Sequence, residues 1–127
     1  MAKMLSVDDS MVMRRIIRGA VEVLGYTFLE AGDGAAAFEV LAREWQDIAL
    51  ILLNVNMPGM NGLEVLEKIK ASDVYRHIPV MMVTTESERV QVVRAIKAGA
   101  ANYVCKPFTP EELTTKMVES LGLTLEL

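Results

Sequence analysis

Short apolar runs alternate with longer amphipathic segments along the whole chain. Five runs have the length of a buried β-strand, at residues 4–7, 27–31, 48–53, 80–83 and 103–105. Five segments repeat apolar positions at the period of an α-helix, at residues 11–24, 35–44, 63–71, 88–98 and 110–121. The pattern predicts that strands and helices alternate from one end of the chain to the other.

Helix start and stop signals support these boundaries. Side chains able to cap a helix precede four of the segments: Asp33, Asn61 with Glu64, Thr85 with Glu88, and Thr109 before Pro110. Gly25 and Gly99 follow two of the helices, where a glycine commonly ends a helix in the left-handed conformation. The helix count therefore rests on local chemistry as well as on periodicity.

The alternation also predicts the fold class. Strands separated by helices and short connections pair in parallel through right-handed crossovers, which place helices on both faces of the sheet. We therefore expect a doubly wound α/β fold with a five-stranded parallel sheet. The 127 residues are enough for one hydrophobic core and too few for two, so residues 1–127 are expected to form a single domain.

Composition and charge narrow the classes of function. The net charge is -4 and there is no long Lys/Arg tract, so direct binding to nucleic acid is not expected. The single cysteine, Cys105, excludes an internal disulfide and fits a reducing compartment. The apolar start is too short for a signal peptide and no run reaches membrane-spanning length, so we expect a cytoplasmic protein with no membrane contact.

Polar side chains stand at the carboxyl ends of four predicted strands. They are Asp8 and Asp9, Asn54 and Asn56, Thr84, and Lys106. In a doubly wound sheet these ends meet at the crevice where ligands bind. Asn54 closes an apolar run and precedes a turn-rich stretch, so its side chain is expected to be presented at the sheet edge rather than packed in the core.

This set of side chains predicts a phosphorylation pocket. Two adjacent carboxylates raise each other's pKa unless a cation lies between them, and hard oxygen ligands suit Mg²⁺. The ammonium of Lys106 and the hydroxyl of Thr84 suit the oxygens of a phosphoryl group beside the metal.

With these residues the sequence resembles the receiver domain of bacterial two-component response regulators, of the chemotaxis (CheY-like) type. The motifs that carry the resemblance are Asp8-Asp9, the stretch at residues 54–62, Val83-Thr84, the stretch at residues 99–103, and Lys106-Pro107-Phe108. The resemblance covers essentially the whole chain. It implies a flavodoxin-like sheet of strand order 2-1-3-4-5 and the role of a signalling protein rather than an enzyme.

The resemblance also implies roles for single residues. Asp9 binds Mg²⁺ directly, Asp8 acts largely through water, and the backbone carbonyl of Asn56 is a further ligand. Thr84 and Lys106 hold the phosphoryl group.

The same resemblance implies how the signal leaves the pocket. A partner sensor histidine kinase donates the phosphoryl group, and Tyr103 changes rotamer as Thr84 moves. A downstream protein then binds the face made by the fourth helix, fifth strand and fifth helix, where we expect Arg94, Lys97 and Tyr103 to contribute. The peptide bond between Lys106 and Pro107 is expected to be cis.

Asn54 is the departure from the family pattern. Family members accept the phosphoryl group on an aspartate at this position, and an amide lacks the nucleophilic carboxylate oxygen. The chain is therefore predicted not to be phosphorylated at residue 54. Its amide oxygen leaves Asn54 as a possible metal ligand, with weakened Mg²⁺ binding. The change Asn54→Asp is expected to lower metal-free stability by about 1 kcal/mol.

Two origins of Asn54 remain open: an engineered substitution, or a natural receiver that signals without phosphate. The other pocket residues are all present, which favours the engineered origin. Two other classes of protein also have related folds. One is a phosphatase with Asp8 as nucleophile, although such enzymes usually have a longer chain with a cap insertion. The other is a flavodoxin-like electron carrier, although the chain has no Ser/Thr/Gly-rich phosphate loop after the first strand.

Overall fold

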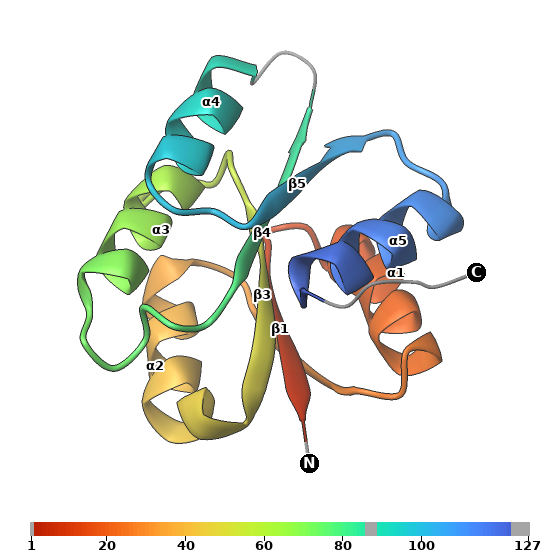
Figure 1. Ribbon diagram of the computed structural model, residues 1–127, viewed down its shortest axis with the longest axis horizontal. Helices are drawn as coiled ribbons and strands as arrows, with labels where there is room; N and C mark the ends of the chain where they lie inside the picture. The colour runs from red at the N-terminus through yellow and green to blue at the C-terminus, as the bar shows by residue number, and fades with distance from the viewer. Residues whose placement is uncertain (1, 86–88, 123–127) are drawn as a thin grey trace.

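A computed structural model describes residues 2–85 and 89–122 of this protein. In it, the β-sheet lies between two layers of helices (Figure 1). The five parallel strands have the order β2-β1-β3-β4-β5, which confirms the order implied by the family resemblance. The strands are β1 (Lys3–Val7), β2 (Thr27–Ala31), β3 (Ile48–Asn54), β4 (Val80–Thr85) and β5 (Asn102–Lys106). The helices are α1 (Met11–Val23), α2 (Gly34–Glu44), α3 (Gly62–Ala71), α4 (Arg89–Lys97) and α5 (Pro110–Ser120), with a 3₁₀ turn η1 (Trp45–Asp47) that the periodicity did not predict.

The central strand β3 has apolar side chains on both faces because helices cover both. Leu50 and Leu52 pack with residues of α1 and α5, and Ile51 and Leu53 pack with residues of α2 and α3. All four side chains are fully buried. Figure 1 shows the same division, with α1 and α5 on one side of the sheet and α2, α3 and α4 on the other. A continuous apolar run is what such a doubly covered strand requires.

The predicted caps fix where several helices begin. The side chains of Asp33 and Thr109 accept backbone N–H groups of α2 and α5, and Asn61 forms a complete capping box with Glu64 at α3. Ser10 caps α1, which the sequence analysis did not predict. The predicted capping box of Thr85 with Glu88 lies outside the described residues, since the description resumes at residue 89.

The strands extend further toward the site than their apolar runs. Asn54 pairs with Val83, and Thr84 pairs with Cys105, so polar residues belong to the parallel ladder itself. Backbone hydrogen bonding continues past the last apolar side chain, which is why hydrophobicity alone placed the ends too early. The site residues therefore sit on or directly after strands. Within the described residues, no helix is long and apolar enough to cross a membrane.

Candidate functional site

The carboxyl ends of β1, β3 and β5 bring five of the predicted site residues together. The side-chain nitrogen of Asn54 lies 3.4 Å from Asp8 Oδ1, 3.3 Å from Asp9 Oδ1 and 3.0 Å from the backbone oxygen of Asn56. The ammonium of Lys106 lies 3.8 Å from Asp8 Oδ2. Residues far apart in sequence thus surround the Asn54 amide at the carboxyl end of the sheet.

Backbone contacts hold the acidic loop after β1 in place. The N–H of Asp8 donates to the carbonyl of Ala31, and its own carboxylate accepts the N–H of Ser10 at 2.9 Å. The guanidinium of Arg14 donates to the carbonyl of Asp8 at 2.6 Å and pairs with Glu30 at 2.7 Å. The sequence analysis missed Arg14, whose only signal is a basic residue one turn into the first helix. This side chain fixes the direction of the loop that carries both aspartates.

Residue 54 is held by the close approach of α3 to the end of β3. The N–H of Gly62 donates to the carbonyl of Val55 at 2.8 Å. A Cβ added at Gly62 would lie 2.1 Å from the backbone oxygen of Asn54, far inside van der Waals contact. The Asn54 side chain is only 7% exposed. It does lie at the sheet edge, but it is packed among polar atoms, so the expectation that it is presented rather than packed was wrong.

The direction of the Asn54 amide follows from its neighbours. Its three partners are two carboxylate oxygens and a carbonyl oxygen, all of which only accept hydrogen bonds. The NH₂ group must therefore face them, and the amide oxygen points away from the acidic residues. In this arrangement Asn54 offers no oxygen to a cation at that point. Its predicted role as a metal ligand requires the amide to turn over.

Asp8 is a buried carboxylate. The residue is 1% exposed, and its Oδ2 has no hydrogen-bond partner among the described residues. Burial raises the pKa of Asp8, and the nearby charge of Asp9 adds to the rise. The N–H of Ser10 and the ammonium of Lys106 act against it. A buried carboxylate oxygen with no hydrogen-bond donor is a place where a cation would be stabilising.

The donor set fits a hard divalent cation such as Mg²⁺. Asp8 Oδ1, Asp9 Oδ1 and the Asn56 carbonyl oxygen lie around one point. The buried Asp8 Oδ2 has no hydrogen-bond partner in the part of the chain that the structure describes. Within the part of the chain that the structure describes, no group of three or more His, Cys, Asp or Glu residues could hold a metal ion. The site instead combines two carboxylates with a backbone carbonyl.

Two further predicted residues lie on the strands β4 and β5. Thr84 is buried at the end of β4, and its hydroxyl donates to the carbonyl of Thr85 at 3.1 Å. Tyr103 on β5 is 41% exposed, with the ammonium of Lys116 5.7 Å from its ring centre. The Lys106–Pro107 peptide bond is cis, as expected.

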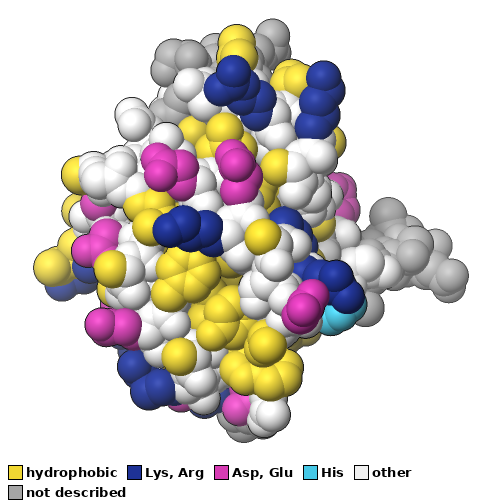
Figure 2. Space-filling view, turned by 90° about the vertical axis from the view of Figure 1, so that its left-hand side faces the viewer, with side chains coloured by type: hydrophobic (Ala, Val, Ile, Leu, Met, Phe, Trp, Pro, Cys, Tyr) yellow, Lys and Arg dark blue, Asp and Glu magenta, His cyan; other side chains and the backbone are white. Residues whose placement is uncertain are grey.

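Arg94 and Lys97 are exposed on α4. Figure 2 shows Lys and Arg side chains gathered with hydrophobic ones at the α4 end of the face covered by α2, α3 and α4. Arg94 also lines a pocket of about 200 Å³ together with Asn56 and Asn61. The predicted partner residues are thus accessible, and one of them borders the site.

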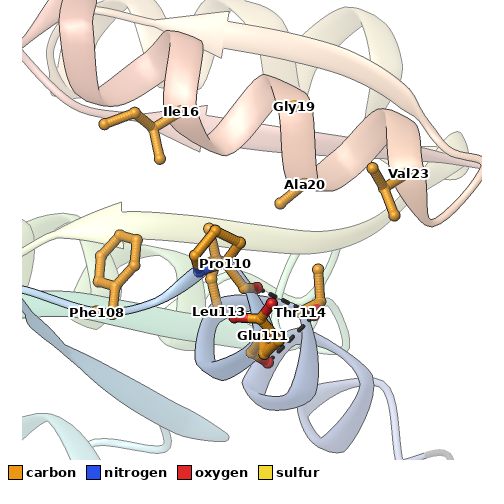
Figure 3. A pocket seen from close by; sticks show the side chains of 9 residues that line it. All are labelled: Ile16, Gly19, Ala20, Val23, Phe108, Pro110, Glu111, Leu113 and Thr114. Carbon is orange, nitrogen blue, oxygen red and sulfur yellow. Dashed lines mark hydrogen bonds between the residues drawn. The ribbon is translucent and has the colours of Figure 1, made fainter.

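A second hollow lies between α1 and α5 and differs in chemistry. It is a groove of about 520 Å³, to which α1 contributes Ile16, Ala20 and Val23 (Figure 3). The hydroxyl of Thr114 on its opposite wall donates to carbonyls of its own helix and so is not directed at a ligand. The groove carries no set of convergent polar groups, and the polar site at the strand ends remains the functional candidate.

A doubly wound sheet of this strand order, with two acidic residues after β1 and a lysine ending β5, defines a receiver domain. The chain belongs to the response regulator receiver domain family, whose model matches residues 4–118. Receiver domains of this type are signalling proteins that bind Mg²⁺ at their phosphorylation site and interact with histidine kinases and downstream targets.

The chain is similar to chemotaxis proteins of several bacteria. The chain is 44% identical over 121 residues to a chemotaxis protein CheY homolog of Campylobacter jejuni, a match that covers 94% of this chain and 92% of the relative. It is also 44% identical to chemotaxis protein CheY1 of Helicobacter pylori, with coverage of 94% and 97%. Among solved structures, the chemotaxis response regulator CheY4 of Vibrio cholerae superposes with a TM-score of 0.85 at 31% identity, with coverage of 94% and 98%.

Proposed function

We propose that this chain is a chemotaxis-type receiver domain held in its unphosphorylated form by Asn54. One observation carries the proposal: the Asn54 amide stands at the end of β3, in contact with both aspartates and the carbonyl of Asn56. This is the position at which the resemblance places the phospho-acceptor aspartate. The contacts of Asp8 with Asn54 and Lys106 support this assignment.

The chemistry explains why the substitution blocks phosphoryl transfer. In the family reaction, a carboxylate oxygen forms a bond to phosphorus as the bond between phosphorus and the kinase histidine nitrogen breaks. An amide has no anionic oxygen to form the acyl phosphate. Asp8, Asp9 and the carbonyl of Asn56 would hold Mg²⁺, which when bound offsets the negative charge of the phosphoryl oxygens. Lys106 and Thr84 would contact those oxygens from β5 and β4.

A single substitution accounts for the pocket better than gradual loss of function. Asp8, Asp9, Thr84 and Lys106 are all retained, and four of the five residues that meet at the strand ends still carry the expected group. We therefore infer that Asn54 is an engineered change in a working regulator. The alternative is a natural receiver that signals without phosphate.

The output face is proposed to be the one formed by α4, β5 and α5. The apolar side chains of Val90, Val93 and Ile96 are exposed on α4 at 70%, 56% and 45%. Arg94 and Lys97 stand on the same helix and Tyr103 on the neighbouring strand. Exposed apolar residues beside basic ones are typical of a protein-binding surface. The signal would leave through this face by protein contact.

Beryllofluoride, which mimics a phosphoryl group on a carboxylate, tests the proposal. With Mg²⁺ present, the Asn54→Asp variant should show NMR amide shifts at Thr84 and Lys106 and over the output face. The chain with Asn54 should show none of these shifts, and neither should the control Asn54→Ala. If the chain with Asn54 shifted in the same way as the Asp variant, residue 54 would not be the acceptor position.

A further inference from the structure

The Asn54 NH₂ group occupies the point on which the oxygens of the acidic residues converge. Its nitrogen is 3.0 Å from the Asn56 carbonyl, 3.3 Å from the Asp9 carboxylate and 3.4 Å from the Asp8 carboxylate. The amide hydrogens carry partial positive charge, so the group attracts these oxygens as a cation would. We propose that the Asn54 amide is an internal substitute for the divalent cation and competes with it for the site.

This inference rests on the proposed function, in which Asp8, Asp9 and the Asn56 carbonyl bind a divalent cation. Mg²⁺ would be held by the same oxygens that the Asn54 NH₂ group now contacts, and each of these oxygens would have to exchange the amide for the ion. The ion and the NH₂ group exclude each other. Asn54 could become a ligand only by turning its oxygen inward, which would give up all three contacts of the nitrogen.

Competition between the Asn54 amide and Mg²⁺ predicts a different effect on Mg²⁺ affinity than the loss of one negatively charged ligand does. If Asn54 acted only as a weak ligand, removing its side chain would remove an oxygen and weaken Mg²⁺ binding further. If the amide competes with the ion, removing it frees Asp8 and Asp9 and strengthens binding. Alanine at position 54 therefore separates the two, because it has neither the ligand oxygen nor the competing NH₂ group.

The first test is Mg²⁺ affinity by calorimetry for four proteins: the chain as it stands, Asn54→Ala, Asn54→Asp, and the control Asn102→Ala. The control removes an amide at the first residue of β5, which is at the amino ends of the parallel strands, opposite the site. Asn54→Ala is expected to bind Mg²⁺ about fivefold more tightly than the parent, the scale of one net hydrogen bond. Asn54→Asp should bind more tightly still, and the control should match the parent. Weaker or equal binding by Asn54→Ala would overturn the inference.

The second test needs no metal, so it stands even if the proposed cation site fails. In EDTA, the side-chain NH₂ protons of Asn54 should exchange with solvent much more slowly than those of the exposed Asn56, as measured by NMR. Equal exchange rates would overturn the inference. Failure of the proposed cation site would appear differently, as the absence of Mg²⁺ binding by Asn54→Asp.

Discussion

The substitution Asn54→Asp changes the charge of the site with almost no change in size. In the metal-free protein the NH₂ group that now contacts three oxygens would be replaced by a carboxylate oxygen. Three attractive contacts would become repulsive ones in a site where Asp8 is fully buried. The variant should therefore be less stable than the parent when no cation is present.

The distances set the size of this effect. Two unit charges at the 3.3 Å that separates Asn54 from the Asp9 carboxylate repel by about 1.3 kcal/mol in water and about 5 kcal/mol at an effective dielectric constant of 20. Protonation limits the loss, because a carboxyl of ordinary pKa can become neutral at pH 7 for about 4 kcal/mol. We therefore expect a loss of about 2–4 kcal/mol, above the 1 kcal/mol expected from the sequence, which did not show the direct contacts.

Thermal and urea unfolding of both proteins in EDTA at pH 7 measure this loss directly. A loss of 2 kcal/mol should lower Tm by roughly 6 °C or more in a domain of this size. Saturating Mg²⁺ should restore about 2.7 kcal/mol to the Asp variant at a hundredfold excess over Kd, and much less to the parent. The reasoning is refuted if the Asp variant melts at or above the parent in EDTA.

Two further predictions concern the backbone and pH. Gly62→Ala should lower the free energy of unfolding in urea by about 3 kcal/mol, because the added Cβ would meet the Asn54 carbonyl. The control Gly19→Ala on α1, where a Cβ would have nothing within 4 Å, should be neutral or stabilising by up to about 1 kcal/mol. Equal effects of the two substitutions would contradict this. The raised pKa of Asp8 means that the folded protein binds this proton more tightly than the unfolded chain. The ionised Asp8 carboxylate therefore lowers the free energy of unfolding at pH values above its pKa in the folded protein. This loss of stability becomes smaller as the pH falls from that pKa toward 3.8, the ordinary pKa of an aspartate. Asp8→Asn should raise Tm in EDTA at pH 7 with a gain that shrinks toward pH 4, and a gain independent of pH would count against the assignment.

The fold could be predicted because local signals agree with the tertiary structure. The apolar run of β3 requires helices on both faces, and caps such as Asp33 and Asn61 mark helix starts within a few residues of sequence. The end of β3 was placed one residue early because Asn54 continues the backbone ladder with a polar side chain. Hydrophobicity reports burial, whereas a strand ends where its hydrogen bonds end.

The sequence predicted that polar residues meet at the strand ends, but it could not predict their orientations. Asp8 and Asn54 are separated by 46 residues, and which amide atom faces the carboxylate depends on neighbours that only the folded chain brings together. The contact of Arg14 with the Asp8 carbonyl is equally invisible in the sequence. The turn-rich stretch after Asn54 ends at Gly62, and the fold requires a glycine there because α3 approaches the backbone of residue 54.

The central claim is that residue 54 alone decides whether this receiver can be phosphorylated. Intact mass spectrometry after incubation with acetyl phosphate and Mg²⁺ tests it most directly, on the chain with Asn54 and on Asn54→Asp. The account predicts that the Asp variant gains the mass of one phosphoryl group and that the chain with Asn54 gains none. A stable phosphoryl adduct at residue 54 of the unchanged chain would contradict it, as would an Asp variant that remains unmodified while properly folded.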